Sequence, residues 1–327
     1  MGLLQNGQWV DQWYDTDNNG GEFQRQDSRF RNWLTPKGET GPNGEHGFKA
    51  EKGRYHLYVS LACPWAHRTL IFRGLKQLQD YIDVTVVEPV MLENGWEMRD
   101  PLYQLNYVYQ LYLKADGNYE GRVTVPLLWD KQTQTIVSNE SSEIIRMFNN
   151  AFNHLTGNTS DYYPEDLHDK INALNDRIYE TINNGVYRTG FASTQKSYES
   201  AFHSLFDSLD WVESLLTKQR YLTGDELTEA DWRLFTTLIR FDAVYFGHFK
   251  ANRQQLADYP AISDYVRELY QMPGIAETVN FTHIKTHYYA SHLTINPTRI
   301  IPFGPEQDFT AAHNRAQHKR AARIGES

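Results

Sequence analysis

The chain contains a single cysteine, Cys63, whose neighbours favour reactivity. It follows an alternating apolar run and precedes a segment with helical spacing, so we expect it at a strand-to-helix turn. A cysteine at the start of a helix faces unpaired backbone N–H groups and the positive end of the helix dipole, and both favour the thiolate. Pro64 suits the first helical position, where a missing N–H has no cost. Cys63 is therefore a candidate nucleophile, although a lone cysteine is more often a small buried apolar residue.

The residue three positions after the cysteine limits how a disulfide could be resolved. Dithiol oxidoreductases carry a second cysteine there, whereas this chain has Ala66 and no other cysteine. A disulfide formed on Cys63 must therefore be resolved by an external thiol. The start of the sequence lacks an apolar signal core, so we expect a cytoplasmic location, where glutathione is the abundant thiol.

The composition restricts the class of partner. The chain has 327 residues, of which 40% are hydrophobic and 22% charged, as is ordinary for a globular protein of two domains. Its net charge of −9 disfavours binding to phosphate backbones. No apolar run is long enough to cross a bilayer. We therefore expect neither a nucleic-acid partner nor a membrane partner.

An α/β pattern surrounds the cysteine. The expected elements are a strand at 54–60, a helix at 65–79, a strand at 83–88, a hairpin of 125–129 and 135–138, and a helix that opens at 138–141. This order is typical of a thioredoxin-like domain, expected over residues 51–160. Within this domain, residues from about 89 to 121 show no regular helix or strand pattern and are interpreted as an insertion. The bond before Pro126, which opens the hairpin, is a candidate cis bond beside Cys63.

The segments on either side of the thioredoxin-like domain have different residue patterns. Residues 1–50 are interpreted as an irregular extension held by aromatic side chains, and residues 291–327 as a tail. Residues 165–290 show helical periods and predict an all-helical domain. Thr228 and Asp231 fit a capping box, which we assign to folding.

Glu140 and Ser141 begin the last helix of the thioredoxin-like domain. The free amides of that helix and the Ser141 hydroxyl suit the carboxylate of a γ-glutamyl group, and Glu140 suits its amine. A plain capping role for Glu140 and Ser138 explains the pattern equally well.

Several long motifs resemble the glutathionyl-hydroquinone reductases, or Xi-class glutathione transferases. These motifs are residues 58–68 (YVSLACPWAHR), 121–126 (GRVTVP), 138–141 (SNES), 183–187 (NNGVY), 240–242 (RFD) and 271–274 (QMPG). The resemblance implies the glutathione transferase fold, with an α/β thioredoxin-like N-terminal domain and an all-helical C-terminal domain, usually as a homodimer. It also implies reduction of S-glutathionyl-hydroquinones without metal, flavin or nicotinamide.

The resemblance also implies residue roles. Cys63 would be the nucleophile and Tyr187 the proton donor to the departing hydroquinone. Tyr245 and Tyr288 would line the hydroquinone pocket near the thiolate. The glutathione site would comprise Trp96, Arg122, Val123, Thr124, Val125, Glu140 and Ser141.

Three other readings remain open on the residues alone. Cys63 also suits a general thioltransferase or dehydroascorbate reductase. A scaffold protein on the same fold typically loses the reactive residue and the glutathione site, both of which are present here. Conjugation of glutathione to electrophiles uses a Ser or Tyr hydroxyl, so we expect it to be weak.

Overall fold

The computed structural model of the chain describes residues 2–42 and 46–318, which divide into two compact units. The first unit contains the described residues of 1–15, together with 24–161 and 277–302. The second unit contains 16–23, 162–276 and the described residues of 303–327. None of the helices described in either unit is long and apolar enough to cross a membrane.

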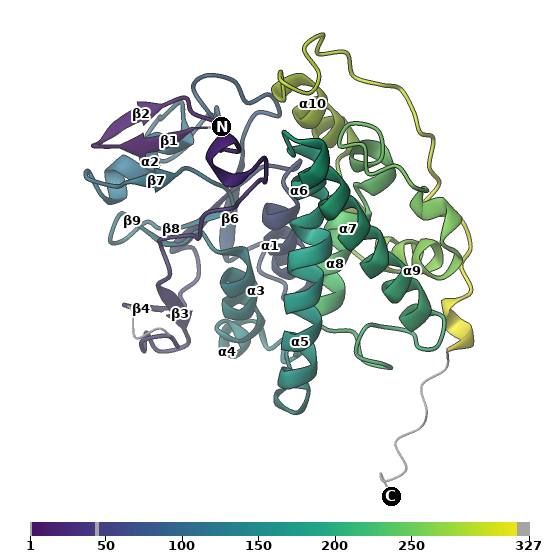
Figure 1. Ribbon diagram of the computed structural model, residues 1–327. Helices are drawn as coiled ribbons and strands as arrows, with labels where there is room; N and C mark the ends of the chain where they lie inside the picture. The colour runs from purple at the N-terminus through teal and green to yellow at the C-terminus, as the bar shows by residue number, and fades with distance from the viewer. Residues whose placement is uncertain (1, 43–45, 319–327) are drawn as a thin grey trace, which may run out of the picture. The chain divides into compact units, whose positions relative to one another are not determined.

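A four-stranded sheet in the order β6-β5-β8-β9 forms the centre of the first unit (Figure 1). Its strands are β5 (Tyr55–Val59), β6 (Ile82–Val86), β8 (Leu127–Asp130) and β9 (Thr135–Ser138). Strands β5 and β6 run parallel, β8 is antiparallel to β5, and β9 is antiparallel to β8. All five side chains of β5 are buried, as expected for a central strand covered on both faces. The predicted β-α-β unit and hairpin are confirmed.

Two helices pack against each other beside this sheet. Helix α1 (Pro64–Leu75) joins β5 to β6, and α3 (Ser141–Asn150) follows β9 and is followed by the short α4 (Asn153–Thr156). Both α1 and α3 begin directly after residues of chemical interest, Cys63 and Glu140. The predicted helix starts are therefore confirmed.

The inserted segment contains a helix that the sequence pattern did not reveal. Helix α2 (Val108–Ala115) buries Val108, Leu111 and Tyr112, which share one face of the helix. Gln110 accepts a hydrogen bond from the backbone N–H of Tyr107 and so caps the start of the helix. The helix has only eight residues, too short for its apolar stripe to stand out among the neighbouring tyrosines.

The N-terminal extension contains short strands that pair with other parts of the first unit. Strand β1 (Leu3–Gln5) lies between β2 (Gln8–Val10) and β7 (Gly121–Arg122), antiparallel to both, whereas β3 (Trp33–Thr35) and β4 (Gly47–Lys49) pair in parallel. Asn32 also donates its N–H to the carbonyl of Val137 beside β9. The pairing of β1 with β7 joins segments far apart in sequence, which local periodicity does not show. In contrast, β1 and β2 form a local hairpin around Asn6 and Gly7, a turn signal that the interpretation of residues 1–50 as irregular overlooked.

Helix α10 (Phe281–Ser291) belongs to the first unit, although its sequence lies within the helical stretch expected over 165–290. The His287 ring shares a hydrogen bond with the carbonyl of Pro89, and Ser291 accepts one from the N–H of Met91. Helical periodicity identifies a helix but not the body that it packs against. The structural division of the chain therefore differs from the sequence-based boundaries.

The second unit consists mainly of helices. These are α5 (His168–Ile178), α6 (Gly185–Gly190), α7 (Gln195–Leu216), α8 (Glu229–Leu238) and α9 (Pro260–Tyr270), with π-helical turns at Tyr179–Asn183 and Phe241–Tyr245. The capping box predicted at the start of α8 is present, since Asp231 accepts the N–H of Thr228 at 2.9 Å. Asp231 also accepts from the N–H of Leu222 and the hydroxyl of Tyr265, so it joins three segments.

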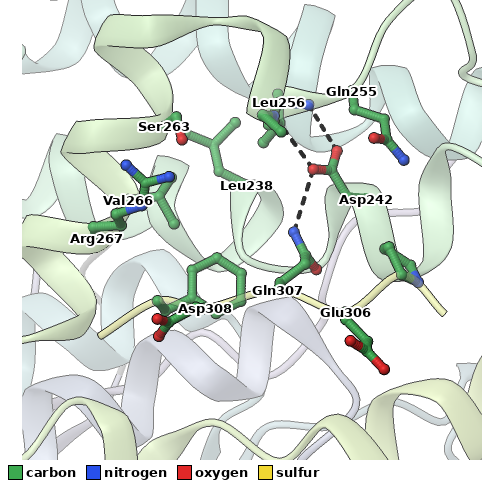
Figure 2. A pocket seen from close by; sticks show the side chains of 13 residues that line it. Leu238, Asp242, Gln255, Leu256, Ser263, Val266, Arg267, Glu306, Gln307 and Asp308 are labelled. Carbon is green, nitrogen blue, oxygen red and sulfur yellow. Dashed lines mark hydrogen bonds between the residues drawn. The ribbon is translucent and has the colours of Figure 1, made fainter. Parts of the chain in front are cut away.

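The described end of the chain runs along the second unit. Gln307 donates its side-chain amide to Asp242 at 3.2 Å, beside the backbone of Leu256 (Figure 2). Arg315 is only 2% exposed and donates to the carbonyls of Leu216, Gln219 and Arg220. These contacts dock a segment that the sequence pattern had interpreted as a tail. Residues 319–327 of that predicted tail lie outside the described residues.

Candidate active site

Cys63 is the N-cap residue of α1, at the predicted strand-to-helix turn. Its half-buried sulfur accepts the N–H of Ala66 at 3.5 Å and, as a thiol, donates to the carbonyl of Val125 at 3.5 Å. The bond between Val125 and Pro126 is cis, as the sequence analysis had hypothesised. The helix dipole and the Ala66 amide both favour negative charge on the sulfur.

Two buried basic side chains, His67 and Arg68, follow the cysteine on α1. Arg68 is 2% exposed and donates to the hydroxyl of Ser141 at 3.4 Å, so it connects the second turn of α1 to the start of α3. The imidazole of His67 shares a 2.7 Å hydrogen bond with the hydroxyl of Thr278. The guanidinium of Arg68 adds positive charge close to the start of α3.

Glu140 caps α3 with one carboxylate oxygen. Oε1 accepts the N–H of Ser142 at 3.0 Å and its hydroxyl at 2.8 Å, while Oε2 accepts from the hydroxyl of Ser28 at 3.2 Å. Burial pushes the pKa of Glu140 up, but the Ser142 hydrogen bonds and the charges of Arg68 and Arg31 outweigh it, so the net pKa is lowered. The capping role considered for Glu140 is present, and its carboxylate is held in the charged form that would attract an ammonium group.

Residues 122–125 connect β7 to the cis proline. Arg122 does not present a simple anion site, since its guanidinium donates to the carbonyls of Gln12 and Trp13 and lies 4.2 Å from the Tyr14 ring. The other three residues are Val123 and Val125, both buried, and Thr124, which is half-buried. The carbonyl of Val125 accepts a hydrogen bond from the Cys63 sulfur at 3.5 Å.

Trp96 and Tyr288 share an aromatic cluster in the first unit. Trp96 is 4% exposed and stacks on His287, with ring centroids 4.8 Å apart. Tyr288 is 1% exposed and meets His287 and His292 edge-on. His292 in turn contacts Trp13 of the N-terminal extension.

Tyr187 and Tyr245 lie together in a separate aromatic cluster of the second unit. Their ring centroids are 6.0 Å apart, and each ring contacts Phe249 at 5.4 Å. Phe23 and Phe191 complete the surroundings of Tyr187. Both tyrosines are buried. Because they belong to a different unit from Cys63, their roles toward the thiolate stay predictions.

Three further residues, which were not among the sequence-based candidates, organise the surroundings of Glu140 and Thr124. Ser28 holds Glu140, Asn139 anchors the turn before it, and Tyr112 bonds to both Thr124 and Asn139. Asn139 stands inside a motif that the analysis had singled out, so its position gave some signal. Ser28 and Tyr112 gave none, because each acts across more than ten residues of sequence. Among the described residues, no group of three or more His, Cys, Asp or Glu is arranged to hold a metal ion.

Two family models match the chain. One is the glutathione S-transferase N-terminal domain at residues 62–151, which includes Cys63, and the other is the C-terminal domain at residues 195–268. The two domain models thus cover parts of both structural units.

Individual relatives cover almost the whole chain. The glutathionyl-hydroquinone reductase YqjG of Escherichia coli is 58% identical over 96% of this chain and 98% of its own length. The glutathionyl-hydroquinone reductase PcpF of Sphingobium chlorophenolicum is 51% identical over 94% of this chain and 97% of its own. The glutathione-bound structure of YqjG matches with a TM-score of 0.86 over 88% of this chain and 96% of that one. A Xi-class structure from Natrialba magadii matches with a TM-score of 0.89 at 45% identity, over 97% of each chain. The chain therefore belongs to the glutathione transferase family, in the Xi class that contains the glutathionyl-hydroquinone reductases.

Proposed function

We propose that the protein reduces S-glutathionyl-hydroquinones to hydroquinones with glutathione as the reductant. The observation that carries this proposal is the position of Cys63 at the start of α1, where the Ala66 N–H donates to its sulfur at 3.5 Å, together with the absence of a second cysteine from the chain. This arrangement favours a single thiolate that forms a mixed disulfide and needs an external thiol to release it. The names of the relatives YqjG and PcpF support the choice of substrate class.

The first step transfers glutathione to the enzyme. The Cys63 thiolate attacks the glutathione sulfur of the substrate, a sulfur–sulfur bond forms, and the aryl carbon–sulfur bond breaks. The electron pair of the broken bond stays on the aryl carbon, which takes up a proton and leaves as the hydroquinone. In the second step a second glutathione thiolate attacks the glutathione sulfur of the mixed disulfide. Oxidised glutathione leaves, and the Cys63 thiolate is regenerated.

The residues near the start of α3 suit the γ-glutamyl end of glutathione. Glu140 is a carboxylate whose pKa is lowered, so it is charged at neutral pH and attracts an ammonium group. Ser141, at the first position of α3, offers a hydroxyl and a helix N-terminus to a carboxylate. Val123, Thr124 and Val125 would align the peptide backbone of glutathione next to the nucleophile. Trp96 and Arg122 would form the outer wall of the site. Arg122 would do so by its hydrogen bond to the carbonyl of Trp13 in the N-terminal extension.

Protonation of the departing ring requires an acid, and Tyr187 is the proposed donor. A phenol can supply a proton to carbon as the carbon–sulfur bond breaks. Tyr187 lies among Tyr245, Phe249 and Phe191, a set of rings that suits a flat aromatic substrate. Tyr245 and Tyr288 are the proposed lining of the hydroquinone pocket.

A homodimer, a cytoplasmic location and independence from metal, flavin and nicotinamide remain predictions.

The test uses purified protein, a glutathionyl-hydroquinone and excess glutathione, with release of hydroquinone followed by chromatography. Cys63→Ala is the variant, and Ser193→Ala, a surface change outside the site, is the matched control. We expect rapid release by the wild type and the control, none by Cys63→Ala, and a glutathione adduct on Cys63 by mass spectrometry when glutathione is limiting. Equal release by Cys63→Ala would exclude Cys63 as the nucleophile. Turnover of a simple mixed disulfide without release of hydroquinone would instead favour a general thioltransferase.

A further inference from the structure

The hydroxyl of Tyr112 has four polar contacts in the interior of the first unit, of which the one to the Thr124 hydroxyl, at 3.4 Å, is the longest. It donates to the carbonyl of Thr124 at 2.9 Å and accepts the N–H of Thr124 at 3.2 Å and the side-chain amide of Asn139 at 3.0 Å. Tyr112 is completely buried, and it lies on α2, the helix of the inserted segment. A tyrosine hydroxyl has one proton and two acceptor positions, so these three bonds saturate it.

The side chain of Asn139 is oriented by a second contact. Its Oδ1 accepts the backbone N–H of Phe30 at 3.2 Å, while its own backbone N–H donates to the Phe30 carbonyl at 3.2 Å. Because Oδ1 is occupied as an acceptor, the amide nitrogen faces Tyr112 as a donor. The N-terminal extension therefore fixes the group that reaches the hydroxyl.

The two partners of Tyr112 lie next to the two halves of the proposed glutathione site, which are residues 123–125 beside the nucleophile and residues 140–141 at the start of α3. Thr124 precedes Val125, whose carbonyl lies 3.5 Å from the Cys63 sulfur. Asn139 precedes Glu140, the N-cap residue of α3. The Tyr112 hydroxyl thus connects the segment beside the nucleophile to the turn that would hold the γ-glutamyl end, and a longer 3.4 Å contact between the Asn139 amide and the Thr124 hydroxyl runs beside it. The two segments are 15 residues apart in sequence.

We propose that Tyr112 is a positioning residue that sets the spacing between these two halves and so determines the affinity for glutathione. The inference rests on the proposed function, since it takes residues 123–125 and 140–141 as the glutathione site. Tyr112 itself does not have to contact glutathione or the hydroquinone. It also gives the inserted segment a role, because α2 delivers the hydroxyl.

Removal of the hydroxyl has a defined physical consequence. In Tyr112→Phe the carbonyl and N–H of Thr124 lose their bonds to the hydroxyl, and the amide of Asn139 keeps its longer 3.4 Å contact with the Thr124 hydroxyl. Buried polar groups without a partner raise the free energy of the present spacing, which favours other arrangements of the two segments. The two halves then spend part of their time at a spacing that does not suit glutathione, and the apparent affinity falls by the fraction lost. Once glutathione is bound the chemistry at Cys63 is unchanged, so kcat should be nearly preserved.

The matched control is Tyr55→Phe. Tyr55 is equally buried in the first unit, and its hydroxyl donates to the carbonyl of Lys49. It lies at the opposite end of β5 from the turn that carries Cys63. Loss of this hydroxyl should lower stability without affecting the glutathione site.

The experiment measures glutathione affinity by calorimetry, KM and kcat for turnover, alkylation of Cys63 by iodoacetamide, and the melting temperature. For Tyr112→Phe we expect glutathione Kd and KM to rise about tenfold, with kcat within about twofold and alkylation unchanged. Tyr55→Phe should lower the melting temperature and leave Kd unchanged. An unchanged Kd in Tyr112→Phe, or an equal rise in Tyr55→Phe, overturns the inference.

A second variant keeps the inference testable if Tyr112→Phe folds poorly. Asn139→Ala removes the other side of the same connection and should also weaken glutathione binding. Its effect should be less than additive with that of Tyr112→Phe, because both break one network; full additivity contradicts the coupling. Since binding is measured directly, a wild type that binds glutathione but releases no hydroquinone contradicts the proposed function while the variants still decide the role of Tyr112.

Discussion

The hydroxyl of Ser28 lies 3.2 Å from Oε2 of Glu140, although 112 residues separate the two in sequence. The same hydroxyl lies 3.2 Å from the carbonyl of Asn139. Arg31, three residues after Ser28, forms a bidentate ion pair with Glu143 in the first turn of α3. The N-terminal extension is therefore part of the wall that supports the start of α3.

Ser28→Ala should weaken glutathione binding at low pH more than at neutral pH. The pKa of Glu140 is lowered. Its carboxylate is therefore still charged at pH values near the ordinary pKa of Glu, and it loses its negative charge only as the pH falls through the lowered pKa. The Ser28 hydroxyl is within hydrogen-bonding distance of Oε2 of Glu140, so we expect its removal to raise that pKa toward the ordinary value. Glutathione affinity should therefore fall at a higher pH in the variant than in the wild type. Calorimetric titrations across this pH range check the shift, and superimposable profiles would contradict it.

Ala66→Cys should change how the mixed disulfide is resolved. The backbone N–H of Ala66 donates a hydrogen bond to the Cys63 sulfur, so a thiol on residue 66 lies within reach of the mixed disulfide. We expect the variant to release glutathione from Cys63 without a second glutathione and to accumulate an internal disulfide. Mass spectrometry after a single turnover detects both products. Ala66→Ser serves as the control of equal size, and persistence of the adduct in Ala66→Cys would contradict the geometry.

Tyr187→Phe should slow release of hydroquinone while leaving simple thiol transfer intact. The ring and its contacts with Tyr245 and Phe249 remain, so stability should change by less than about 1 kcal/mol. Loss of a general acid typically lowers the rate by about 10²–10⁴-fold. Parallel assays with a glutathionyl-hydroquinone and a mixed disulfide test this. A similar loss on both substrates would argue that Tyr187 does not act as the proton donor.

Asp231 should make stability depend on pH in the opposite sense to Glu140. Burial raises the pKa of Asp231 to about 6, against the hydrogen bonds from Leu222, Thr228 and Tyr265. The folded protein therefore binds a proton more tightly than the unfolded chain, so the stability due to this group is fully present below about pH 4 and is lost as the pH rises through about 6.

Asp231→Asn removes this titration. The free energy of unfolding of the wild type, relative to Asp231→Asn, should rise by up to about 3 kcal/mol as the pH falls from 7 toward 4. Urea unfolding at several pH values measures the difference. A constant difference between the two proteins would show that the group titrates alike in the folded and unfolded states.

Arg315→Ala should destabilise the second unit by about 3 kcal/mol, because it leaves the buried carbonyl of Leu216 and the partly buried carbonyl of Gln219 without their donor. Arg267→Ala is the matched control: its 3.0 Å pair with Asp264 is partly exposed and should contribute less than about 1 kcal/mol. Urea unfolding compares the two variants. Equal effects would mean that the docked C-terminal segment contributes little to stability.

The sequence by itself determined the features that depend on local order along the chain. The β5-α1-β6 unit, the β8-β9 hairpin and the starts of α1, α3 and α8 all follow from short-range periodicity and capping, and each was predicted. Cys63 as the nucleophile candidate depends on one residue type at one helix start, with Ala66 excluding a second thiol. The resemblance to the family then implied roles for the other candidate residues, among them Tyr187, Tyr245 and Tyr288, which no local pattern distinguishes among 21 tyrosines.

Only the tertiary structure decided which distant residues support that site. Ser28 reaches Glu140, Tyr112 reaches Thr124 and Asn139, and α10 packs with the first unit through His287. These contacts depend on how the chain returns on itself, and a hydrogen bond between distant residues leaves no periodic trace in sequence. Local order along the chain therefore predicts the candidate nucleophile and the helix starts beside it, whereas burial and long-range hydrogen bonds determine which distant side chains contact them.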